Sequence, residues 1–219
     1  MDSKQLQIAY SGSLDAFDPN HTAGFAKCLK QWFWTFKNDT VDSSTRSAYY
    51  LIQAVQLLKS EYGVTSDQLQ LKFWGHINPL NNSQVINSGL SDFFDISGYL
   101  PKSESIVSLS QADMLFLPLE KSNVQGRGTL FIPGKLFEYL NSYKPILALC
   151  EPSDCRDILI QSGLGICINP DRPIEIAQKI LEFITDKSLL EKYKPNKRYI
   201  SDFSFRNKTF ELSEIFRRL

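Results

Sequence analysis

One stretch of the chain, residues 112–150, constrains the fold more than any other. Residues 112–119 and 145–150 are short apolar runs of the kind that form strands buried on both faces of a parallel sheet. Between them lie a glycine-containing loop and then apolar residues at helical spacing behind Pro133. The order of strand, loop, helix and strand predicts one unit of a parallel α/β sheet.

The start of this predicted helix has the features of an anion site. Gly134 and Lys135 follow Pro133, and free backbone N–H groups at a helix N-terminus bind phosphate with the help of the helix dipole. Glu138 lies about one turn further on, where a carboxylate can accept two hydroxyl hydrogen bonds from a sugar such as ribose. A phosphate site beside a ribose acceptor favours a nucleotide as the ligand.

The rest of the chain repeats the alternation of strands and helices. Further strand-like runs cover residues 6–12, 69–75, 93–101 and 164–169. Helical patterns cover residues 44–63, 83–90, 103–111, 153–161, 174–184 and 207–219. In the helix at 103–111 we expect Ser103 to be the cap and Ile106, Val107 and Leu109 to face inward. This alternation predicts an α/β fold, a doubly wound (Rossmann-like) parallel sheet of about six strands with helices on both faces.

Composition narrows the classes of function. The 24 basic and 24 acidic residues give no net charge, so no global field attracts nucleic acid and any anion site must be local. No apolar run reaches the roughly 18 residues of a membrane span, and the N-terminus lacks the layout of a signal peptide. We therefore expect one cytoplasmic domain that covers residues 1–219.

The cysteines and histidines do not predict a metal site. The four cysteines, at positions 28, 150, 155 and 167, have no paired C-x-x-C spacing, and the two histidines lie far apart in sequence. Cys150 and Cys167 fall in strand-like runs, where a reduced cysteine is most simply a small core residue.

Residues 15–45 depart from this compact alternation and predict an inserted segment. Trp32 and Trp34 lie there among lysines, a combination suited to a membrane interface or a lipid-linked acceptor. The same aromatic residues also suit a helix or hairpin packed on its own domain, since aromatic side chains bury much area per residue. Both interpretations stay open at this point.

Arg46 is a candidate anion ligand. Ser44 and Thr45 predict the N-cap of the helix at 44–63, which places Arg46 in its first turn. A cation there opposes the helix dipole, which favours a functional reason for the residue over a solvated surface position.

Several motifs together resemble a known family. The run PGKLFEYL at residues 133–140, followed by KPIL at residues 144–147, resembles the donor-binding motif of family 4 retaining glycosyltransferases and their two-domain relatives of the GT-B fold. IAYSGSL, LKFWG, ISGYLP, ADMLFLPL and SGLGICI occur in the order and rough spacing of the C-terminal nucleotide-sugar domain of that family. The resemblance covers nearly the whole chain.

The resemblance implies a role for each matching residue. The nucleotide-sugar ligands that it implies are Gly12 and Ser13 at the diphosphate, backbone groups of Tyr99 and Leu100 at the base, Pro133 and Gly134 at the phosphates, and Glu138 at the ribose. Arg46 stands where the family places a lysine, so Arg46 and Lys135 are the implied catalytic cations for the leaving diphosphate. Ser13 replaces an arginine of the family, and Leu130 replaces the first of its two glutamates.

The implied function is that of the donor-binding half of a hexosyltransferase in polysaccharide biosynthesis. Such an enzyme transfers a sugar from a nucleotide diphosphate donor to an acceptor with retention of configuration and without an essential metal or other cofactor. The acceptor-binding N-terminal domain is absent from this sequence, so the isolated half is expected to be inactive. Two alternatives remain, a nucleotide-sugar 2-epimerase-like domain and a non-catalytic nucleotide-binding or interaction module.

Overall fold

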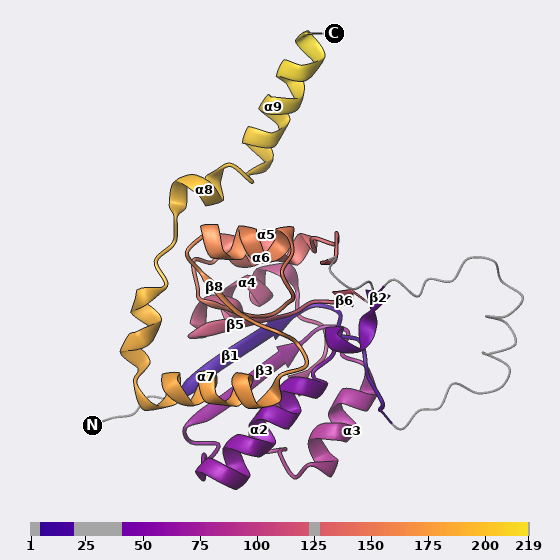
Figure 1. Cartoon of the computed structure of the whole chain (residues 1–219), viewed down its shortest axis with the longest axis vertical. Helices are drawn as coiled ribbons and strands as arrows, with labels where there is room; N and C mark the ends of the chain where they lie inside the picture. Colours follow the sequence, from indigo (N-terminus) through magenta and orange to yellow (C-terminus); the bar gives the residue numbers. More distant parts are fainter. Residues whose placement is uncertain (1–4, 20–40, 123–127, 219) are drawn as a thin grey trace, which may run out of the picture.

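Six parallel strands form the central sheet of the computed structural model, which describes residues 5–19, 41–122 and 128–218 (Figure 1). In chain order the strands are β1 (Leu6–Ser11), β3 (Leu69–Trp74), β4 (Phe94–Ser97), β5 (Met114–Pro118), β7 (Ile146–Leu149) and β8 (Gly165–Ile168). Across the sheet they follow the order β4-β3-β1-β5-β7-β8, so the chain builds one half outward from β1 and then the other. This is the strand order of a Rossmann fold, and the predicted doubly wound sheet is confirmed.

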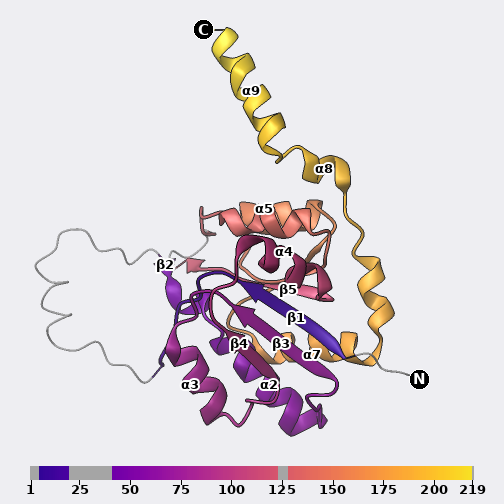
Figure 2. The same cartoon turned by 180° about the vertical axis from the view of Figure 1, so that it is seen from behind.

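Helices cover both faces of the sheet, as Figures 1 and 2 show from opposite sides. One face carries α2 (Tyr49–Tyr62), α3 (Pro79–Asn87) and α7 (Pro173–Thr185). The other face carries α4 (Lys102–Gln111), α5 (Gly134–Asn141) and α6 (Asp154–Gln161). Each layer has its own apolar cluster, because successive side chains of a strand point to opposite faces.

The central strands are buried because their apolar runs are covered on both faces. Every residue of β5 and of β7 is buried, and full burial of a Leu or Phe side chain contributes about 1.5–3 kcal/mol. Next to them, Tyr10, Phe73 and Phe116 form an aromatic cluster across three neighbouring strands, with ring centroids 5.5–6.1 Å apart. This cluster fixes the ends of β1, β3 and β5 relative to one another.

The helix predicted from residue 44 begins later than expected. α2 starts at Tyr49, and the preceding residues form a separate 3-10 turn, η1 (Ser43–Arg46). The Asp42 side chain caps this turn by accepting from the Ser44 N–H at 2.9 Å, and the Thr45 hydroxyl donates to the Leu119 carbonyl at 2.8 Å. Arg46 is therefore the last residue of the 3-10 turn, and its expected position in the first turn of the long helix is wrong.

The predicted inward face of α4 is also wrong in part. Pro101 is the N-cap residue, so Ser103 lies inside the helix and does not cap it. Ile106 and Val107 are exposed, whereas Leu109 is buried. The face that meets the sheet carries Leu109 and, one turn earlier, Ser105, which hydrogen bonds to residues of β1 and β3. A polar contact to the sheet thus sets the rotation of this helix about its axis.

The C-terminal segment extends away from the sheet. After η2 (Lys187–Lys192) and α8 (Lys197–Ser201), the expected closing helix is α9 (Phe205–Arg217), which projects outward in Figure 1. None of its residues is buried, and Phe210 is 63% exposed. α9 therefore adds no core to the described part of the chain.

The predicted insertion at 15–45 is described only at its two ends, and Trp32 and Trp34 lie outside the described residues. At its end, β2 (Val41–Asp42) pairs antiparallel with β6 (Lys121–Ser122) beyond the end of β5. No helix in the described part of the chain has the length and apolar character that a membrane span requires.

Candidate functional site

Two glycines at the carboxyl edge of the sheet lie backbone to backbone. Gly12 follows β1 with a φ of +127°, and Gly75 follows β3 with a φ of +119°. Residues other than glycine rarely adopt these backbone conformations. A Cβ atom on Gly75 would lie 2.4 Å from the Gly12 carbonyl oxygen. The Gly12 N–H donates to the Trp74 carbonyl at 3.0 Å, and the Gly75 N–H donates to the Gly98 carbonyl at 3.2 Å. Backbone hydrogen bonds thus join the exits of β1, β3 and β4.

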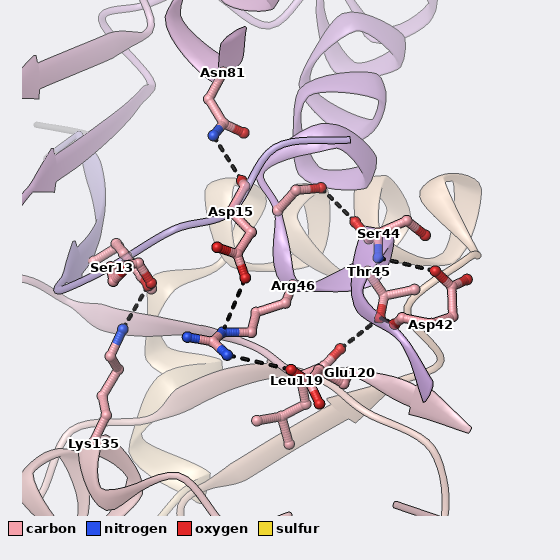
Figure 3. Close-up of polar contacts among 12 residues, drawn as sticks. Ser13, Asp15, Asp42, Ser44, Thr45, Arg46, Asn81, Leu119, Glu120 and Lys135 are labelled. Carbon is pink, nitrogen blue, oxygen red and sulfur yellow. Dashed lines mark hydrogen bonds and ion pairs between the residues drawn. The ribbon is translucent and has the colours of Figure 1, made fainter. Parts of the chain in front are cut away.

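Lys135 lies against the first of these glycines. Its side chain extends from the start of α5, and its Nζ atom is 2.7 Å from the position that a Cβ of Gly12 would occupy. The Nζ atom donates to the Tyr10 hydroxyl at 2.5 Å and lies 3.8 Å from the centroid of the Tyr10 ring. The Tyr10 hydroxyl in turn donates to the Ser13 carbonyl. Figure 3 shows Lys135 pointing toward the segment of Ser13, so the structure brings three of the sequence-predicted site residues together.

Burial dominates the electrostatics of Lys135. Removal from water is the larger cause and the positive charge of Arg46 the smaller one, and together they disfavour the ammonium form and lower the pKa of Lys135 to about 7. Glu138, on the same helix, acts in the opposite direction. Burial also raises the pKa of Tyr10, so its hydroxyl stays protonated and remains a donor to Ser13.

A second hydrogen-bond network holds the end of β1 and was not predicted from the sequence. The Ser11 N–H donates to the Tyr139 hydroxyl at 3.1 Å, which ties β1 to α5. The Ser11 and Ser105 hydroxyls lie 2.7 Å apart, and the Trp74 indole N–H donates to the Ser105 oxygen at 2.9 Å. The one sequence signal that could have indicated the contact between Ser11 and Tyr139 is that Tyr139 lies four residues after Lys135, on the same face of the helix.

Arg46 lies between two carboxylates. Its Nε atom is 3.6 Å from Asp15 and its Nη1 atom is 3.2 Å from Glu120, as Figure 3 shows. The Asp15 N–H also donates to the Arg46 carbonyl at 3.2 Å, so the backbone holds this pair as well. The guanidinium lies 6.0 Å from the Phe131 ring, in the loop before α5. Since two negative charges accompany one positive charge, the group formed by Arg46, Asp15 and Glu120 carries a formal charge of minus one.

Glu138 is exposed and reaches the neighbouring helix. One carboxylate oxygen lies 3.6 Å from the Lys102 Nζ atom at the start of α4. An exposed pair of this kind contributes roughly 0–1 kcal/mol, so a ligand can replace it at little energetic cost. The loop before α4 holds Tyr99, which is 81% exposed, and Leu100, which is partly buried. The contact therefore joins the predicted ribose and base regions.

A small cavity of about 220 Å³ lies beneath this loop, between the β3–β4 edge of the sheet and α4. Trp74, Ser97 and Leu100 are among the residues that line it. Its volume is below the ~300–1,000 Å³ of pockets that enclose a drug-sized ligand. This cavity is therefore too small to enclose a drug-sized ligand.

The described residues include no group of three or more His, Cys, Asp or Glu side chains that could hold a metal ion. Cys150 and Cys155 are buried and carry free thiols. Burial raises the pKa of the Cys155 thiol to about 12, which keeps it protonated and unreactive.

Comparison with known proteins identifies the architecture. No protein-family model matches the sequence, and no curated protein sequence is significantly similar to it. Among solved structures, HepE from Anabaena, crystallised with UDP-glucose, superposes with a TM-score of 0.59 at 14% identity over 98% of this chain and 49% of HepE. Sucrose-phosphate synthase from Thermosynechococcus elongatus gives 0.67 at 13% identity, over 100% of this chain and 46% of the synthase. The chain has the fold of a GT-B glycosyltransferase domain.

A structure described as a UDP-N-acetylglucosamine 2-epimerase, from Listeria monocytogenes, is also similar, with a TM-score of 0.51 and 12% identity over 87% of this chain and 39% of that one. The chain spans about half the length of HepE and of the synthase. Leu130, where the resembled family has its first glutamate, is 90% exposed in the loop before α5.

Proposed function

We propose that the chain is the nucleotide-sugar-binding part of a hexosyltransferase that uses a nucleotide diphosphate sugar as its donor. The observation that carries this proposal is the contact of Lys135 with Gly12. It places a lysine amine beside a glycine loop and a helix start, at the carboxyl edge of a sheet whose fold is shared with sugar transferases. Ligands of doubly wound sheets bind at this edge, where the strand order reverses.

Each part of the donor has a matching position at this edge. The diphosphate would meet the exposed segment of Ser13 and the free N–H groups at the start of α5. The ribose would replace Lys102 as the partner of Glu138, and the base would lie over the backbone of Tyr99 and Leu100. Because Lys102 is 79% exposed, it can turn away without loss of packing.

The chemistry proposed for this site is departure of the diphosphate with cationic stabilisation. Lys135 and Arg46 would stabilise the charge that develops on the leaving group, a role that otherwise falls to a divalent metal. We therefore propose transfer without an essential metal or other cofactor, and retention of configuration as in the resembled family.

The proposal extends to a second domain that completes the cleft. The neighbours are about twice as long as this chain, and the part that this chain does not cover would bind the acceptor. On this proposal the described half binds donor but transfers no sugar alone. Synthesis of a polysaccharide, a cytoplasmic location and a lipid-linked acceptor at the membrane surface belong to the same proposal.

The test is the donor affinity of Glu138→Gln, measured by calorimetry against UDP-glucose and other nucleotide sugars. Loss of a charged acceptor is expected to weaken binding by about 1.5–3 kcal/mol, or roughly 10- to 150-fold in Kd. Glu175→Gln is the matched control, because Glu175 is a first-turn helix carboxylate paired with Arg172 at 3.9 Å, outside the site. Equal affinity of wild type and Glu138→Gln would remove Glu138 from the ribose site.

A 2-epimerase-like domain is the second candidate, supported by the similarity to the Listeria structure. An epimerase would convert UDP-N-acetylglucosamine to its C2 epimer, which NMR of the sugar ring detects. If no nucleotide sugar binds to the folded protein, the third candidate, a non-catalytic interaction module, is favoured.

A further inference from the structure

Among the groups of the site, the amine of Lys135 is the one whose protonation a bound nucleotide would change most. The side chain extends from α5, on one face of the sheet, past Gly12 to the hydroxyl of Tyr10, whose ring belongs to the apolar cluster of the opposite face. Within the three described ranges of the chain, no acidic side chain forms an ion pair with this amine. The nearest polar partner is thus a neutral phenol.

The charged and titratable groups around this amine come from three directions. β1 supplies Tyr10, whose hydroxyl is already committed as a donor to Ser13. α5 supplies Glu138, which pairs with Lys102, and Tyr139, which accepts from the Ser11 N–H. The turn η1 supplies Arg46, whose positive charge disfavours a second cation nearby. Asp15 and Glu120 reach Arg46 and form no ion pair with Lys135.

We propose that Lys135 takes up a proton when a diphosphate binds, and that Tyr10 is the positioning residue that holds its amine against Gly12. The inference rests on the proposed function, since it concerns the phosphate part of the same site. Lys135 is then fully protonated only when the ligand is bound.

The charges of the site favour this step. Arg46, Asp15 and Glu120 together carry a formal charge of minus one, so they repel a diphosphate unless a further cation is present. In the free protein, burial keeps the Lys135 amine partly neutral near pH 7. A diphosphate supplies the missing counter-charge, and the neutral amine then accepts one proton from solvent to become the ammonium. No covalent bond of the ligand changes.

Calorimetry in buffers with different ionisation enthalpies counts this proton. UDP-glucose is the suitable probe, because its pyrophosphate diester lacks the phosphate group that titrates near pH 6. With the pKa of Lys135 at about 7 in the free protein, binding is expected to take up roughly 0.1 proton at pH 6, 0.5 at pH 7 and 0.9 at pH 8. Constant uptake, or none, across this range would overturn the inference.

Two substitutions of Lys135 distinguish the effect of a positive charge at this position from the effect of proton uptake. Lys135→Met is expected to abolish the uptake and to weaken UDP-glucose at least tenfold at pH 7, while uridine, which has no phosphate, binds as before. Lys135→Arg keeps a permanent cation, so its binding is expected to proceed without proton uptake and with an affinity that changes little between pH 6 and 8. Uptake that persists in Lys135→Met would assign the proton to another group and refute the proposal.

Tyr10→Phe tests the positioning role, because it removes the hydroxyl and keeps the ring in its aromatic cluster. We expect weaker UDP-glucose binding and a different proton count. The control is Tyr50→Phe, a partly buried tyrosine of α2. A proton count and an affinity unchanged in Tyr10→Phe would remove Tyr10 from the mechanism.

A ligand-independent measurement separates this inference from the nucleotide proposal. The Lys135 Cε signal, assigned by its absence from Lys135→Met, is titrated by NMR in sulfate and in chloride at equal ionic strength. Sulfate is a divalent anion that does not itself titrate between pH 6 and 8, and it should raise the pKa of Lys135. If no nucleotide binds but sulfate shifts the titration, the anion site and its proton stand and the nucleotide proposal falls; no shift and no binding overturn both.

Discussion

Gly75→Ala is the substitution that best tests the contact between the exits of β1 and β3. A Cβ at this position would lie 2.4 Å from the carbonyl oxygen and 2.9 Å from the nitrogen of Gly12. Both are backbone atoms, so no side chain can turn aside to make room. The φ of +119° adds strain of its own, since L residues rarely adopt it.

The magnitude follows from these two effects. A strained backbone conformation costs about 1–3 kcal/mol, and forcing a methyl group into a closely packed position costs about 1–3 kcal/mol more. Gly75→Ala should therefore lower the free energy of unfolding by about 2–6 kcal/mol. Gly63→Ala is the matched control, because Gly63 has a φ of +65° and a Cβ there would meet nothing within 4 Å. Its expected loss is about 1–2 kcal/mol, from the left-handed backbone alone.

Urea unfolding of the wild type and the two variants measures these losses in the free energy of unfolding. The affinity for UDP-glucose is measured without urea, at a temperature at which all three proteins are folded. Only Gly75→Ala should weaken binding, because only it displaces Gly12 and the segment that faces Lys135. Equal destabilisation by both substitutions, with unchanged affinity, would show that the contact between the two glycines supports neither the fold nor the site.

Two further predictions concern the cations of the site. Arg46→Ala should weaken the binding of UDP far more than that of uridine, because Asp15 and Glu120 are left without their cation and repel the diphosphate. The difference between the two ligands should shrink as the salt concentration rises, and equal losses of affinity for both would contradict this prediction. Lys135→Met should also stabilise the free protein at pH 6, where the lowered pKa of Lys135 penalises the folded state in full. Between about pH 7 and 10.5 the unfolded chain binds more protons than the folded one, so wild-type stability rises and the gap narrows. A gap in melting temperature that stays constant with pH would refute the assigned titration.

The fold was largely predictable because its signals are local. Each buried strand is a short apolar run, and each helix repeats its apolar residues with a period that α2 and α7 keep throughout. α7 was predicted at 174–184 and lies at Pro173–Thr185. Where a contact from elsewhere in the chain intervened, prediction failed. The hydrogen bond from Thr45 to Leu119 separates η1 from α2, and no residue near position 45 in the sequence predicts it.

The helix start and the strand end at the candidate site were predictable, whereas the polar contacts between them were not. Pro133 and Gly134 do begin a helix, and Gly12 does follow the first strand. In contrast, the partners of Lys135 and Ser11, which are Tyr10 and Tyr139, lie more than 120 residues away in the chain. In an apolar strand or on a helix face, a tyrosine has the same pattern as any core aromatic residue. Its hydroxyl contact appears only in three dimensions.

The hydrogen bonds that join the exits of β1, β3 and β4 also bear on the kinetics of recognition. The bonds from Gly12 to Trp74 and from Gly75 to Gly98 continue the sheet ladder past the last residues of the strands. One of these exits cannot open without breaking hydrogen bonds to its neighbour, so the three exits, which together form the rim of the sheet, move as a unit or not at all. A ligand that reaches this rim loses little entropy to the ordering of loops. Its association rate is then governed by diffusion and charge, and selectivity rests on how long it stays.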